Sequence, residues 1–65
     1  MYVINRDDVV KLMTEHIETM NRRLADSHGM DSNQVEILIN QARPELTRIN
    51  GELFDLLVER GVIRS

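Results

Sequence analysis

The 65-residue sequence contains no cysteine and no tryptophan, and it has only one tyrosine and one phenylalanine. Without cysteine, the fold can hold no disulfide and no zinc site with thiolate ligands. A chain this short buries a smaller share of its surface than a larger domain, so small folds commonly depend on disulfides, a metal or oligomerisation. With disulfides and thiolate metal sites excluded, oligomerisation is the expected additional source of stability. We therefore expect a homodimer.

Long apolar runs are absent as well. None approaches the roughly 18 residues that a membrane-spanning helix requires, and segment 1–8 lacks the apolar core of a signal peptide. The chain has 8 basic and 11 acidic residues and a net charge of −3. Non-specific binding to nucleic acid depends on basic groups that neutralise phosphates. We therefore expect a cytoplasmic protein without membrane association, for which nucleic acid is not the main partner.

The first predicted helix has clear signals at both ends. Asn5 can cap its start, and Ile4 can pack on Val9 across the cap. The helix should end near residues 27–28, because Gly29 readily adopts the left-handed conformation that closes a helix. The signals thus predict one helix from the cap at Asn5 to residues 27–28.

The second predicted helix starts at Asp31 or Ser32 and continues to about Arg60, where Gly61 repeats the stop signal. Pro44 lies inside this helix. A proline removes one helical hydrogen bond and clashes with the carbonyl four residues earlier. The helix should therefore be kinked or broken near Pro44, although its apolar spacing continues without a change of phase.

Both predicted helices carry apolar residues in alternating steps of three and four, the spacing of two helices that pack side by side. On the first helix these residues are Val10, Met13, Ile17, Met20 and Leu24, and on the second Val35, Ile39, Ala42, Leu46, Ile49, Leu53 and Leu56. Folding at the loop 28–31 pairs the two rows in antiparallel order, and the end of the second helix should meet residues 2–4. We expect an all-α antiparallel helical hairpin that occupies residues 1–65 as one domain.

More apolar residues are present than this row of contacts uses. The surplus on the two predicted helices consists of Val9, Leu12, Ile37, Leu38, Phe54, Leu57 and Val58. A contiguous apolar patch on a soluble protein commonly marks an interaction surface. These residues are the predicted partner or dimer interface, and pairing of two hairpins into a four-helix bundle would cover many of them.

No motif demands a catalytic, metal or cofactor site. His16 and His28 are the only histidines, and the positions three and four residues from His16 hold no common metal ligand: Leu12, Met13, Thr19 and Met20. His28 precedes a helix-ending glycine, where capping is its expected role. Glu45 and Glu52 share a helix face, but a hairpin this small should enclose no cavity of ligand size in which carboxylates could act as acid and base. We expect no enzyme activity and no cofactor.

Four arginines support an alternative prediction. Arg22, Arg23, Arg43 and Arg48 could form a basic stripe that contacts nucleic acid. Several glutamates are interleaved with them in the hairpin, which dilutes the stripe. Nucleic-acid binding is therefore the second of the two functions that we consider.

In outline the chain resembles the plasmid-encoded RNA-binding hairpins of the Rop type and the small co-chaperones of type III secretion. The run that begins at Asn50 also resembles the Ser-Gln-Glu-Leu-Asp signature of hairpin phosphatases that act on response regulators. Asn50 replaces the serine of that signature, and Phe54 stands where the aspartate belongs, with Asp55 one place later. One place on a helix is a rotation of about 100°, so the phosphatase activity is not expected.

The sequence thus favours a small protein-binding regulator or adaptor. It should act as a homodimer through an apolar helical face, and its partner should be another protein. Helix-in-groove recognition is the expected mode of binding.

Overall fold

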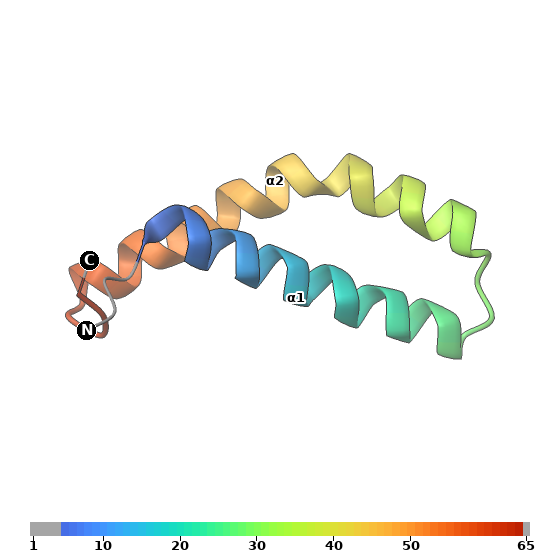
Figure 1. The fold of residues 1–65 in the computed structure, drawn as a ribbon, viewed down its shortest axis with the longest axis horizontal. Coiled ribbons are helices and arrows are strands. Elements are labelled where there is room, and N and C mark those ends of the chain that lie inside the picture. The colour runs from blue at the N-terminus through green and yellow to red at the C-terminus, as the bar shows by residue number, and fades with distance from the viewer. Residues whose placement is uncertain (1–4, 65) are drawn as a thin grey trace.

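The computed structural model describes residues 5–64, and two long helices occupy most of them (Figure 1). Helix α1 spans Arg6–Ser27 and helix α2 spans Ser32–Glu59, and a short loop folds α2 back along α1. The molecule is elongated, with a radius of gyration of 14.3 Å against about 11 Å for a compact domain of this length. The predicted all-α antiparallel hairpin is confirmed.

The helix ends follow the predicted signals. The Asn5 carboxamide accepts hydrogen bonds from the backbone N–H groups of Asp7 and Asp8 at 2.9 and 3.4 Å, and the Asp31 carboxylate accepts one from Asn33 at 3.0 Å. Both donors of the first cap belong to the opening turn, whose N–H groups have no partner within the helix. Side-chain caps thus fix where each helix begins.

Glycine closes both helices. Gly29 has φ +70° and Gly61 has φ +73°. Residues other than glycine rarely adopt this left-handed backbone conformation. At the end of α1, the backbone N–H of His28 donates to the carbonyls of Leu24 and Ala25. His28 therefore caps α1, as predicted, but through its backbone N–H.

Pro44 does not interrupt α2. The helix is continuous from Ser32 to Glu59, with Pro44 in its interior. The predicted break is therefore wrong, and the predicted kink remains a prediction.

The contact between the helices differs from the predicted one. The buried residues of α1 are Val10, Thr14, Glu18 and Ala25, and those of α2 are Val35, Ile39, Asn50, Gly51 and Phe54. Only Val10, Val35 and Ile39 come from the two predicted apolar rows. Polar side chains occupy the middle of the contact, and several predicted core residues lie at the surface.

The spacing of the buried residues explains this difference. Val10, Thr14 and Glu18 are four residues apart, as are Val35 and Ile39 and also Asn50 and Phe54. Rows with a spacing of four pack helices at a larger crossing angle than the alternating three-four spacing does. Figure 1 shows the start of α1 crossing α2 near the end that holds both termini. The three-four rows therefore cannot face one another along their whole length.

Phe54 requires a correction. We expected it to lie off the contact between the helices, as part of an exposed interface. Its side chain is instead only 2% exposed and is the most completely buried one in the described chain, whereas Leu53 and Leu56 are exposed. A rotation of α2 by one position moves Phe54 into the contact and turns its neighbours outward.

Four predicted contacts lie outside the described residues. They are the packing of Ile4 on Val9 and the contacts of residues 2, 3 and 4 with the last turns of α2.

Candidate functional site

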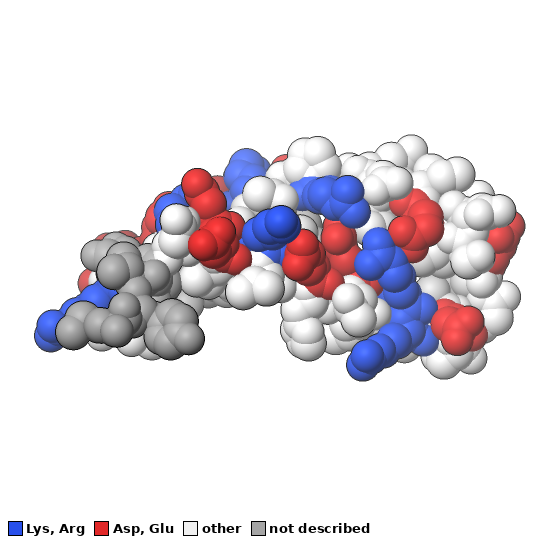
Figure 2. All heavy atoms as spheres, in the orientation of Figure 1, with Lys and Arg blue, Asp and Glu red and all other residues white. Residues whose placement is uncertain are grey.

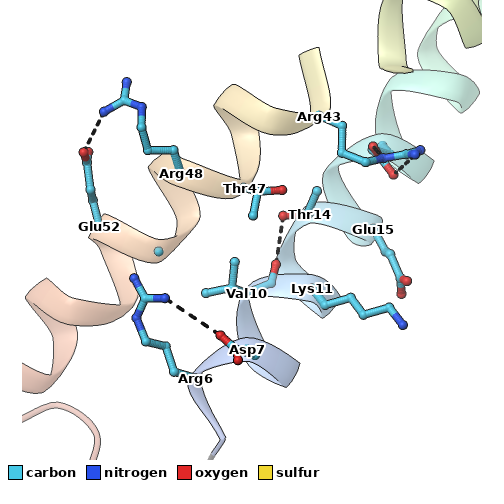
Figure 3. Close-up of a pocket in the computed structure, with 12 residues that line it drawn as sticks. Arg6, Asp7, Val10, Lys11, Thr14, Glu15, Arg43, Thr47, Arg48 and Glu52 are labelled. Carbon is cyan, nitrogen blue, oxygen red and sulfur yellow. Dashed lines mark hydrogen bonds and ion pairs between the residues drawn. The ribbon is translucent and has the colours of Figure 1, made fainter. Parts of the chain in front are cut away.

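One face of the hairpin holds a polar groove of about 710 Å³ between α1 and α2 (Figure 3). Lys11, Thr14 and Glu15 line it from α1, and Arg43 and Thr47 line it from α2. We expected no enclosed cavity of ligand size, and this groove is open to solvent. Its volume falls in the usual range of ligand sites, so the charges along it decide what it can bind.

The charges along the groove pair mainly with each other. Arg43 reaches from α2 to the Glu18 carboxylate at 2.8 Å, and the Glu18 side chain is only 6% exposed. Outside this groove and nearer the loop, Arg22 forms a bidentate pair with Glu36, with N–O distances of 2.7 and 2.9 Å. Figure 2 shows acidic and basic side chains intermingled on the face turned toward the viewer. Three of the four cations that line the groove, Arg6, Arg43 and Arg48, have carboxylate partners within the described residues, and Lys11 is the fourth.

These pairs shift the acid–base equilibria of their members. The Arg22 guanidinium lowers the pKa of Glu36 below its ordinary value of 4.5, chiefly through the side-chain hydrogen bond. Arg6 lowers the pKa of Asp55 in the same way. Both carboxylates are thus held in their charged form, as in structural ion pairs.

Arg6 also explains a glycine in the interior of α2. Its guanidinium binds Asp55 with N–O distances of 2.9 and 3.1 Å. A Cβ atom built on Gly51 would lie 2.6 Å from Nη2 of Arg6. The arginine therefore occupies the space that a larger residue at position 51 would fill.

A buried hydrogen bond joins the two helices next to the groove. The Asn50 side-chain amide donates to the Thr14 hydroxyl at 3.0 Å, and this hydroxyl donates to the Val10 carbonyl at 2.8 Å. Both side chains are buried. A buried polar pair is satisfied in only one alignment, so it fixes the position of α2 along α1.

The arginines of the nucleic-acid prediction do not form a free basic stripe. Arg22 and Arg43 pair across the hairpin as described, and Arg48 pairs with Glu45 and Glu52 along α2. Three of the four cations thus have carboxylate partners within the chain, and the fourth, Arg23, is exposed.

The opposite side of the hairpin is apolar. We call it the reverse face and define it by two rows: Met13, Ile17, Met20 and Leu24 on α1, and Leu38, Ala42, Ile49, Leu53 and Leu56 on α2. Six of these nine residues are large apolar side chains that the hairpin leaves exposed, among them Leu24 at 57% and Leu56 at 40%. None of the nine carries a charge.

Helix geometry places both rows behind the polar groove. Met20 follows Lys11 by nine residues, and Leu24 follows Glu15 by the same interval. On α2, Thr47 lies nine residues from both Leu38 and Leu56. Nine residues are two and a half turns, a rotation of about 180°. Lys11, Glu15 and Thr47 line the groove, so the apolar residues point the other way on both helices.

The two rows meet in a second groove near the loop, which we call the loop-end groove. Its volume is about 340 Å³, and Leu24 of α1 and Leu38 and Ala42 of α2 contribute to its walls. Buried Ala25, Val35 and Ile39 form its floor and the main apolar cluster of the hairpin. The reverse face is therefore continuous across both helices at this end.

The predicted interface residues are distributed unevenly. Leu12, Ile37 and Leu38 are exposed, while Val9, Leu57 and Val58 are half-buried and Phe54 is buried. Leu38 belongs to the reverse face, and Leu12 and Ile37 each lie one residue, about 100°, from one of its rows.

The sequence prediction missed most of the exposed apolar surface because it assigned that surface to the helix–helix contact. Met20, Leu24, Ile49, Leu53 and Leu56 were all expected to be core residues. Their three-four spacing predicted burial between the two helices, but the hairpin leaves all five exposed.

The structure brings no metal-binding cluster together within residues 5–64. His16 and His28 are both exposed. Neither described helix has the length and apolar character required to cross a membrane.

No protein-family model, no curated protein and no solved structure matches the chain. The function is therefore inferred from the two faces of the hairpin.

Proposed function

We propose that the protein is a small regulator or adaptor that binds helices of a protein partner on its reverse face. Two parallel rows of apolar side chains on neighbouring helices form the kind of surface against which an amphipathic helix packs. A homodimeric four-helix bundle is one form that such binding takes.

The observation that carries this proposal is the area that the chain leaves uncovered. It exposes 5375 Å², whereas a folded monomer of 7.6 kDa exposes about 4,300 Å² by the usual scaling of surface with mass. Large apolar side chains on one face contribute to this excess, and such patches on soluble proteins mark interaction sites. The excess is the expected property of a partner-binding hairpin.

The polar groove supports a small-molecule function less well. Of the cations that line it, Arg43 is bound to Glu18, and Arg48 is bound to Glu45 and Glu52. A charged ligand would have to displace these partners. The same pairs weaken the nucleic-acid alternative, because phosphates would compete with carboxylates already in place.

Matched charge variants test the proposal. Leu38→Asp places a charge on the reverse face, and Thr47→Asp places the same charge on the opposite side of the same helix. The test compares which proteins, including the chain itself, each tagged variant retains from an extract of its native host, with circular dichroism to verify folding. The proposal predicts that Leu38→Asp loses a protein that Thr47→Asp and the unmodified chain retain. Equal retention by folded forms of both variants would contradict it.

A further inference from the structure

We propose that the partner on the reverse face is a second copy of this chain. In this dimer, the two hairpins are related by a two-fold axis and run antiparallel, so that Leu53 and Leu56 of one copy lie in the loop-end groove of the other. This inference rests on the proposed function, because it names the occupant of the same surface.

The uncovered area matches what a stable dimer needs. The chain exposes 5375 Å², about 1,100 Å² more than a folded monomer of its mass is expected to expose. If two copies each bury that excess, the interface has a total area of about 2,200 Å², which lies at the start of the range for obligate dimers. Binding of a second copy would therefore bury an area equal to the excess exposed surface of the chain.

The distribution of charge also suits self-association. The chain has a net charge of −3, so two copies repel each other unless their charged groups stay apart. The rows of the reverse face contain no Asp, Glu, Lys or Arg, and the cross-helix ion pairs of Glu18 and Glu36 close within each chain. Glu45 lies within about 20° of Leu38 and Leu56 on α2, but its charge is paired with Arg48 of the same chain. Two reverse faces can thus meet without bringing unpaired like charges together.

The two ends of the reverse face have complementary shapes. Near the loop, Leu24, Leu38 and Ala42 help to form a hollow of about 340 Å³. Near the other end, Leu53 and Leu56 project from α2, whose 28 residues exceed the 22 of α1. In an antiparallel pair, the projecting end of each copy lies over the hollow of the other.

A two-fold axis makes both of these contacts at once. If Leu56 of the first copy meets Leu38 of the second, symmetry requires Leu56 of the second to meet Leu38 of the first. The assembly then closes as a dimer and leaves no free reverse face to extend it. The polar grooves, with their ion pairs, face outward on both sides of the four helices.

The absence of native cysteine gives a direct test. Leu38→Cys and Leu56→Cys chains are prepared separately and then treated with a short bismaleimide cross-linker, each alone and as an equal mixture at micromolar concentration. Thr47→Cys on the opposite side of α2 is the control. The arrangement predicts a covalent product of twice 7.6 kDa that is several-fold more abundant in the mixture than in either chain alone, and no such product from Thr47→Cys.

The other outcomes overturn the inference in distinguishable ways. Leu38→Cys that cross-links to itself as efficiently as the mixture does would mean a parallel pair. No cross-link in any sample, with Leu38-dependent retention of a different host protein, would exclude the second copy and leave the proposed function standing. No cross-link together with no Leu38-dependent retention would overturn both.

Discussion

The groove face and the reverse face of the hairpin are built from the same two helices, but their side chains differ in whether they find partners within the chain. On the groove face, charged groups find partners within the chain, as Arg43 does with Glu18 and Arg22 with Glu36. On the reverse face, large apolar side chains such as Leu24 and Leu38 stay in contact with water. The groove face is complete in one chain, and the reverse face is the part that a partner would complete.

The largest effect on stability is expected for a substitution of Phe54, which lies in the contact between the two helices. Phe54→Ala removes the most deeply buried side chain of the described residues and should lower the free energy of unfolding by about 3–5 kcal/mol. Urea denaturation followed by circular dichroism, at one fixed protein concentration, measures this loss. Leu12→Ala is the matched control, because Leu12 is 64% exposed and should change stability by no more than about 0.5 kcal/mol. Equal effects of the two substitutions would show that the helices pack through other faces.

The second largest effect on stability is expected for the buried pair of Thr14 and Asn50 in the contact between the helices. Thr14→Val removes the hydroxyl that accepts from Asn50 and leaves a buried amide unpaired, at a cost of about 1–3 kcal/mol. Thr19→Val is the control, because Thr19 makes the same type of bond to the Glu15 carbonyl without a cross-helix partner. The double variant Thr14→Val with Asn50→Leu should recover part of the loss, since neither polar group then remains. A double variant less stable than Thr14→Val would contradict this role for the pair.

Acid titration tests the ion pairs of the hairpin, because arginines lower the pKa of several of its carboxylates. The pKa of Glu36 is lowered in the folded chain from its ordinary value of 4.5. Its contribution to stability is therefore fully present above that value and is lost as the pH falls through the lower folded value. Thermal melts between roughly pH 6 and 2 should show a shallower acid-side loss of stability in Glu36→Gln than in the unmodified chain.

Arg22→Gln should flatten the same part of the profile, because it removes the guanidinium that holds the carboxylate in its charged form. If neither substitution changes the slope, the Arg22–Glu36 pair does not form in solution.

The smallest effect is expected at Gly51. Gly51→Ala improves helix propensity by about 1 kcal/mol, but the new methyl group must displace the guanidinium of Arg6. Because this group is the flexible end of a side chain, we expect a net stabilisation below about 1 kcal/mol. In an Arg6→Ala background the same substitution should give a larger gain, since the three atoms nearest to the new methyl group all belong to the Arg6 guanidinium. The same gain in both backgrounds would show that Arg6 does not lie over Gly51.

The ends of the helices could be predicted from the sequence because their signals are local. Asn5 and Asp31 cap from within one turn, and Gly29 and Gly61 adopt φ angles that other residues avoid. The antiparallel order of the helices was also predicted correctly, and the ion pair of Glu18 with Arg43 joins α1 to α2.

The rotation of the helices could not be predicted, because the apolar pattern has two consistent explanations. Its three-four spacing predicts which residues pack against another helix, and that helix can belong to the same chain or to another one. The sequence gives no local sign that Thr14 and Asn50 pair, or that Glu18 is buried against Arg43. These contacts appear only once the two helices cross, and they leave Leu24, Leu53 and Leu56 outside.

Sedimentation equilibrium of the unmodified chain across micromolar concentrations tests the central claim most directly, when circular dichroism of the same samples verifies that the chain is helical. If a second copy covers the reverse face, the measured mass is twice the 7.6 kDa of the chain, and Leu56→Asp shifts it toward the mass of one chain while Thr47→Asp does not. A fully helical species that retains the mass of a single chain throughout this range would contradict the account.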